Sequence, residues 1–147
     1  MTDQVVRDLE ALTIQGPNCP SDVGKDVLAR VSAEVKSRLQ SGSVDSADFV
    51  RQVLGALKRI SGTRFAEIRI GCLLDAAHYF YVTGQGICAV DPASDASQLA
   101  EHAGLTALQR KALTLLGIAQ ADTGNISSAV ESYAKALDLA RQLKDRV

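Results

Sequence analysis

Residues 111–144, KALTLLGIAQADTGNISSAVESYAKALDLARQLK, decide the fold of this 147-residue chain. Apolar and small side chains recur every three or four residues on both sides of Gly124-Asn125, which is the spacing of one face of an α-helix. A glycine beside a polar residue is a common helix terminator. The stretch therefore predicts two helices joined by a short turn.

The same pattern stands 40 residues earlier in the chain. Residues 71–104 align with residues 111–144 without a gap and share eight identities in 34 pairs, where chance gives about three. The shared residues lie at the turn glycine and at apolar positions of both helices, so a helical hairpin is repeated. They are Leu73/Leu113, Thr83/Thr123, Gly84/Gly124, Ala89/Ala129, Val90/Val130, Ala96/Ala136, Leu99/Leu139 and Ala100/Ala140.

The second copy resembles a tetratricopeptide repeat. Leu113-x-x-Leu116-Gly117-x-x-Gln120 stands where that family has its W-x-x-L-G-x-x-Y signature, with Leu and Gln in place of the two aromatic residues. The turn, the two small residues and the aromatic of the second helix are matched by Gly124-Asn125, Ala129, Ala136 and Tyr133. The resemblance implies that Gly117 and Ala129 let two helices approach closely and that Tyr133 fills the gap between successive hairpins. The first copy is looser, since Ala93 replaces the aromatic and Pro92 intrudes.

Outward from the repeat, the whole chain is predicted to be helical. Residues 1–21 form a short helix followed by a linker that contains Pro17 and Pro20, and residues 22–147 form one repeat domain. The expected fold is an all-α, right-handed solenoid of about three antiparallel hairpins, with about six long helices plus the short N-terminal one. The hairpins are expected at about 22–61, 64–104 and 106–147. The second helix of the middle hairpin is expected to begin at Asp91-Pro92, an N-cap followed by proline at the first helical position.

Composition excludes several classes of protein. The chain has 16 basic and 17 acidic residues, so it has no net positive charge to bind the phosphates of a nucleic acid. We therefore expect no nucleic-acid partner. There is no apolar run of membrane-spanning length, no polybasic patch and no signal-peptide pattern at the N-terminus. The three cysteines form neither a CxxC pair nor an even disulfide set, which indicates reduced thiols. We therefore expect a cytoplasmic protein that binds no membrane.

Catalytic and metal-binding motifs are missing from the sequence. His78 and His102 are the only histidines, and with Cys72 and Cys88 they lack the close ligand pairs of zinc sites. No phosphate-binding loop, dinucleotide fingerprint or HExxH motif occurs. We expect neither an enzyme nor a cofactor or metal, and read the cysteines as core residues.

The resemblance also implies where a partner binds. In tetratricopeptide solenoids the first helices of the hairpins line a concave groove, and His78-Tyr79-Phe80-Tyr81 supplies the one aromatic run. The alternative is that His78 and Tyr81 only cover the preceding hairpin. The predicted groove residues are Leu74, His78, Tyr81, Lys111, Thr114, Ile118 and Asp122.

The last helix keeps an apolar face that consists of Leu137, Ala140, Leu143 and Val147. A solenoid needs a polar cap over its final face, so either a next repeat follows in a longer protein or the face forms a homodimer. The repeat pitch of 40 is similar to that of tetratricopeptide regions in bacterial signalling proteins.

The sequence thus predicts a non-catalytic protein-interaction or ligand-sensing scaffold that binds a protein or peptide. We expect it to be the N-terminal part of a larger bacterial signalling or regulatory protein. A self-association module is one alternative. Another is a regulator that binds a small molecule or peptide signal, which would place an enclosed pocket near Tyr79, Tyr81 and His78.

Overall fold

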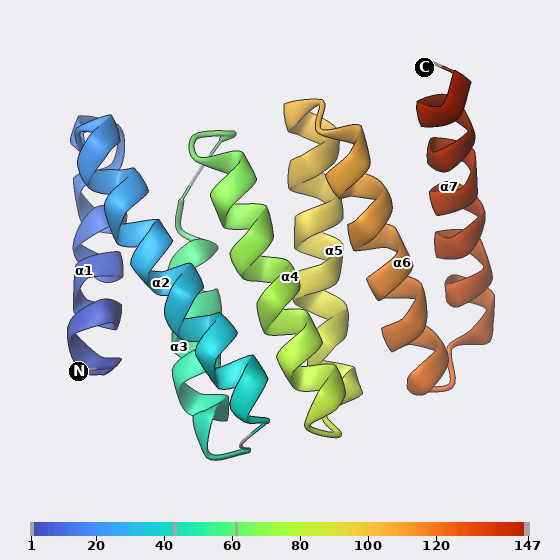
Figure 1. The fold of residues 1–147 in the computed structure, drawn as a ribbon, viewed down its shortest axis with the longest axis horizontal. Helices are drawn as coiled ribbons and strands as arrows, with labels where there is room; N and C mark the ends of the chain where they lie inside the picture. The colour runs from blue at the N-terminus through green and yellow to red at the C-terminus, as the bar shows by residue number, and fades with distance from the viewer. Residues whose placement is uncertain (1, 43, 61, 146–147) are drawn as a thin grey trace.

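The computed structural model describes residues 2–42, 44–60 and 62–145, and they form α-helices joined by short turns (Figure 1). No strand occurs within these ranges, so the predicted all-α class is confirmed. The helices are α1 (Thr2–Gln15), α2 (Ser21–Ser41), α3 (Ala47–Leu57), α4 (Ala66–Val82), α5 (Gly86–Ala103), α6 (Thr106–Asp122) and α7 (Ile126–Asp145). Two 3-10 turns, η1 (Gly16–Asn18) and η2 (Val44–Ser46), precede α2 and α3.

The helices stand side by side in a row, as Figure 1 shows, with α2, α4 and α6 in front and α3 and α5 behind α2 and α4. Along the row α4 packs on α5, α5 on α6 and α6 on α7, while α2 packs on α4. At the N-terminal end, α1 packs against both α2 and α3. Short turns join neighbouring helices that run in opposite directions, which is the arrangement of stacked hairpins.

The internal repeat is also present in the geometry. Helix α6 begins and ends 40 residues after α4, and α7 begins 40 residues after α5. The two turns match as well: Gln85 N–H donates to Phe80 O at 2.7 Å, and Asn125 N–H donates to Gln120 O at 2.8 Å. Gly84 and Gly124 have φ angles of 81° and 87°, a left-handed backbone that closes the helix end at no steric cost for glycine. The two helix pairs are therefore one structural unit repeated.

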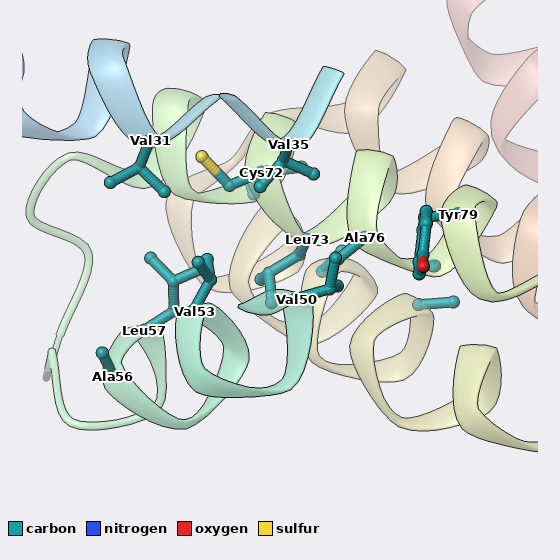
Figure 2. Close-up of a cluster of buried hydrophobic side chains, with 14 of the residues drawn as sticks. Val31, Val35, Val50, Val53, Ala56, Leu57, Cys72, Leu73, Ala76 and Tyr79 are labelled. Atoms are coloured by element: carbon teal, nitrogen blue, oxygen red, sulfur yellow. The ribbon is translucent and has the colours of Figure 1, made fainter. Parts of the chain in front are cut away.

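A single core runs through the row. Figure 2 shows Val50 and Val53 of α3 facing Val31 of α2 and Leu73 of α4, and all four side chains are buried. Further along, small side chains on α5 and α6 let the helices approach closely, and these are Ala89, Ala93, Ala96, Ala100, Ala112 and Ala119. The N-terminal segment shares this core through Leu9, Leu12 and Cys19.

Arg64 links the backbone of residues 16–19, which follow α1, to the start of α4. Its guanidinium donates to Gly16 O at 2.9 Å and to Cys19 O, and stacks 4.6 Å from the centre of the Phe65 ring. Phe65 adopts a left-handed φ of 59° just before α4, and its ring fills the space beside Gly24 of α2 where a Cβ would stand. This unusual backbone is maintained because Gly24 of α2 and the guanidinium of Arg64 hold the ring of Phe65 in place.

The start of α5 differs from the expectation. The helix begins at Gly86 and Pro92 lies inside it, so the prediction of a helix start at Asp91-Pro92 is wrong. A proline within a helix costs about 3 kcal/mol because it removes one hydrogen bond and crowds the preceding turn. The extra turn persists because Gly86 and Ala89 are buried there. Tertiary packing has outweighed the local signal.

Candidate functional site

The predicted groove residues lie on α4 and α6, which are neighbours in the front layer of the row. All seven are at least partly accessible. On α4, His78 and Tyr81 are exposed and Leu74 is half-buried; on α6, Lys111 and Asp122 are exposed, and Thr114 and Ile118 are half-buried. The two helices thus present a mixed apolar and polar face.

The aromatic run divides between the core and this face. Tyr79 and Phe80 are buried and pack edge to face with their ring centres 5.5 Å apart. His78 and Tyr81 are exposed, and Tyr81 keeps 38% of its surface accessible. Only the outer two residues of the run are therefore available to a partner.

Two of the predicted residues also make contacts within the fold. Thr114 Oγ1 donates to the carbonyl of Arg110 at 2.9 Å, within α6. The carboxylate of Asp122 occupies the place where a Cβ on Gly86 would stand, at the first residue of α5. A negative charge is favourable at a helix N-terminus, so Asp122 has a structural role that the sequence did not indicate.

A groove between α3 and α5 was not predicted. It consists of two adjoining cavities of about 300 and 380 Å³ that share Lys58 and Asp95. Its walls carry opposite charges, with Arg51 of α3 and Lys58 directly after α3 on one side and Asp91 and Asp95 of α5 on the other. The remaining lining is mostly apolar: Leu54, Leu57, Leu73, Phe80, Pro92 and Leu99. We call it the α3–α5 groove.

A third cavity, of about 370 Å³, lies over α6 between α5 and α7 and is lined mainly by serine, glutamine and charged side chains. Within it Ser132 Oγ donates to Gln120 Oε1 at 2.7 Å, a contact between α7 and α6. Two further cavities, of about 270 and 200 Å³, adjoin α1. None of the cavities described here is lined by Tyr79, Tyr81 or His78 or by another predicted groove residue.

One face of α7 carries an apolar stripe that is about half exposed. Ile126, Val130, Tyr133 and Leu137 are spaced by four, three and four residues and are 40–61% exposed. Of the predicted apolar face, Leu137 belongs to this stripe and Ala140 and Leu143 are half-buried, whereas Val147 lies outside the described residues. Large apolar side chains that line up on one face commonly mark an interaction surface.

The described residues were also compared with the requirements of a metal site and of a membrane-spanning helix. In the described ranges no three His, Cys, Asp or Glu side chains gather as a metal would require. The imidazole of His102 faces the carbonyl of Gln98, and Cys19 and Cys72 are buried. Across the same ranges, no helix is long and apolar enough to cross a bilayer.

Comparison of the chain with protein-family models, with curated proteins and with solved structures gives no match.

Proposed function

We propose that this chain is a non-catalytic scaffold of the tetratricopeptide type that binds a protein or peptide segment on the face formed by α4 and α6. In this proposal it serves as an interaction or ligand-sensing part of a larger bacterial signalling or regulatory protein. The observation that carries the proposal is the pair of equivalent helices, α4 and α6, which contact each other and carry accessible residues at matching positions of the repeat, such as His78 and Ile118.

The chemistry of this face suits a peptide or a helix. Tyr81 and Ile118 offer apolar area, and aromatic side chains bury much surface at a small loss of conformational entropy. His78 and Lys111 add hydrogen-bond donors and charge at the rim. A helix laid along two such helices would bury its own apolar stripe, as helix-in-groove ligands do.

Panning a displayed peptide library against the purified chain tests this proposal. We expect selected peptides to lose at least about tenfold in affinity on Tyr81→Ala or Ile118→Asp, which is the size of a moderate interface contact. Ile87→Asp, at an exposed apolar position of α5, is the matched control and should change little. Equal affinity for all four proteins would exclude the α4–α6 face.

A second candidate function, self-association through α7, is favoured by a specific observation. The stripe residues Ile126, Val130, Tyr133 and Leu137 stand 40 positions after Gly86, Val90, Ala93 and Ser97 of α5. On α5 these four residues are buried or half-buried, and α6 packs against that helix. The repeat thus places a covering helix over the equivalent face, and a second copy of the chain would supply one.

Sedimentation over a range of concentrations measures this second function. We expect a concentration-dependent dimer that Leu137→Asp abolishes and Ile87→Asp leaves intact, because a buried carboxylate without a partner is costly. A monomer at every concentration would remove self-association and leave the α4–α6 proposal untouched.

A further inference from the structure

Helix α7 stands at the end of the described row and has a neighbouring helix on one side only (Figure 1). Among the described helices, α6 is the one that packs extensively on α7, whereas α5, its counterpart 40 residues earlier, packs on both α4 and α6. The face of α7 that is left partly uncovered carries four apolar residues, which we call the α7 stripe: Ile126, Val130, Tyr133 and Leu137. They are 40–61% exposed, so about half of their surface is available to a partner.

The α7 stripe differs in size from the equivalent face of α5. Val130 matches Val90, but the other three residues are larger than their counterparts. These are Ile126, Tyr133 and Leu137 in place of Gly86, Ala93 and Ser97. All three counterparts are buried on α5, where small residues let a packed helix approach closely. Large side chains at the same positions suit a different contact, in which the side chains of two helices interlock.

The spacing of the α7 stripe is that of a coiled-coil seam. Its residues are four, three and four positions apart, as the a and d residues of a heptad are. This spacing reads the same in both directions, so two copies of α7 that run in opposite directions can align all four residues. Ile126 then lies against Leu137 of the second copy, and Val130 lies against Tyr133 of the second copy. One pair joins two branched aliphatic side chains and the other joins a small to a large side chain, so both pairs fill comparable space.

The charge of Lys144 decides between the two possible directions of the helices. Lys144 is exposed and continues the stripe seven residues beyond Leu137, on the same side of α7. In a parallel pair the two Lys144 ammonium groups would lie side by side and repel each other. In the antiparallel pair they are about 40 Å apart along the helix axis, well beyond the screening length of about 10 Å. Charge therefore favours the antiparallel pair.

We propose that two copies of the chain form a two-fold symmetric dimer in which their α7 helices pack antiparallel along the α7 stripe. Ile126 of each copy contacts Leu137 of the other, and Val130 of each copy contacts Tyr133 of the other. This inference rests on the second proposed function, self-association, and adds to it the direction and register of the helices. A two-fold interface uses the same residues on both copies, as this register does.

The exposed area of the α7 stripe sets the strength of the dimer. With exposed fractions of 40–61% and roughly 200 Å² for a large side chain, the four residues offer about 400 Å² per copy. Two copies would bury about 800 Å² through these residues, whereas stable interfaces bury about 1,200–2,000 Å² in total. We therefore expect a reversible dimer with a Kd on the order of 10 micromolar.

Disulfide formation between single introduced cysteines tests the register. Ile126→Cys and Leu137→Cys are made in separate full-length chains that carry tags of different mass, both with Cys88→Ser to remove the partly exposed native thiol. The two proteins are mixed at about 50 micromolar, above the expected Kd, and oxidised mildly. In the proposed register the two kinds of cysteine face each other, so a mixed disulfide forms. Two cysteines of the same kind are about 16 Å apart along the helix axis, and a disulfide needs Cα atoms within about 7 Å.

We expect the mixed disulfide to exceed either disulfide between identical chains by at least about tenfold. Adding Val130→Asp to both chains should lower its yield by at least about tenfold, because the seam would bury a carboxylate without a partner. Val130 is 61% exposed in the single chain, so this variant should keep its fold, which circular dichroism checks. Ile87→Cys, at an exposed position of α5, is the matched control for Ile126→Cys and should give no mixed disulfide.

The outcomes separate the register from self-association itself. Disulfides between identical chains that exceed the mixed one would show a parallel pair and overturn the inference. A dimer in sedimentation with equal yields of all three disulfides would also overturn it, while self-association would stand. Species larger than a dimer would show head-to-tail stacking and contradict the two-fold arrangement. A monomer at every concentration would remove both the inference and the second proposed function, and peptide selection on the α4–α6 face would be unaffected.

Discussion

The ring of Tyr133 on α7 lies directly against Gly117 on α6, and a Cβ added to Gly117 would stand 2.9 Å from the ring atom Cε1. Gly117→Ala gains about 1 kcal/mol of helix propensity, but forcing the ring away costs about 1–3 kcal/mol. We therefore expect a net loss of stability in urea unfolding. In a Tyr133→Ala background the clash is gone, and the same glycine substitution should become stabilising.

The control for this double-mutant cycle is Gly71→Ala in α4, where the added Cβ would meet nothing within 4 Å beyond its chain neighbours and the backbone of its own helix. This substitution should stabilise the chain by about 1 kcal/mol with or without Tyr133. If Gly117→Ala behaves in the same way as Gly71→Ala, the ring contact carries no packing energy.

Arg69 is predicted to stabilise the loop between α3 and α4. Its guanidinium binds the carbonyls of Ile60, Gly62 and Arg64, and burial lowers its pKa because desolvation disfavours the charge. Arg69→Met should reduce the free energy of unfolding by about 2 kcal/mol or more, since hydrogen bonds to charged groups are worth about 1.5–3 kcal/mol each.

Arg51→Met is the comparison for this loop prediction. Arg51 is exposed and donates to Gln85 Oε1 at 3.0 Å, so we expect a change of less than about 1 kcal/mol. Chemical denaturation measures both variants. Similar losses for Arg51 and Arg69 would show that burial of the guanidinium is not what matters.

Asp75 should make stability depend on pH. Its Oδ2 is buried without a hydrogen bond, and desolvation raises the pKa of the carboxyl, with Lys36 and His78 partly offsetting this. The folded state therefore holds the proton more tightly than the unfolded state, and the associated stability is lost as pH rises through the folded pKa. At neutral pH, Asp75→Asn should raise the melting temperature.

The difference between Asp75→Asn and the wild type should shrink as the pH falls below the unfolded value of 3.8, where the aspartate is neutral in both states. Asp138→Asn, on the exposed surface of α7, should show no such trend. Thermal melts of the wild type and the two variants over a pH series measure these differences in melting temperature. A constant difference at every pH would contradict the role of desolvation.

The three cysteines should differ in reactivity. Cys72 is buried, and desolvation raises its pKa to about 12, whereas Cys88 is partly exposed. Because the thiolate is the reactive form, a thiol reagent at pH 8 should label Cys88 first and should label Cys19 and Cys72 only after unfolding. Cys88→Ser should abolish the fast phase. Fast labelling that survives this substitution would show that the core opens.

Much of the fold was predictable because it depends on local patterns. Helix periodicity, the turn glycines Gly84 and Gly124 and the 40-residue offset are properties of neighbouring residues, and they place α4, α6 and α7 to within a few residues. The start of α5 was not predictable in this way. Its first turn depends on the burial of Gly86 and Ala89 by other helices, which outweighs the signal of Pro92.

The candidate sites also differ in whether local sequence patterns could predict them. That His78 and Tyr81 share one side of α4 follows from helical spacing, and the structure leaves both exposed. The role of Asp122 beside Gly86 and the α3–α5 groove were not visible in the sequence. Arg69 and Asp95, which both line this groove, are 26 positions apart and belong to different helices, so no spacing rule connects them.

By itself, the sequence determined the all-α class, the repeated hairpin and the apolar faces of the helices, because backbone hydrogen bonding and side-chain periodicity act over a few residues. Only the tertiary structure decided which polar groups are buried without partners and which apolar stripe is left uncovered. Burial is a property of the packed arrangement, and the same aspartate or leucine has a different free energy once a neighbouring helix removes it from water. The contact between the Tyr133 ring and Gly117 illustrates both points. The sequence identified the two residues as positions of the repeat, but their contact exists only because α6 and α7 pack together.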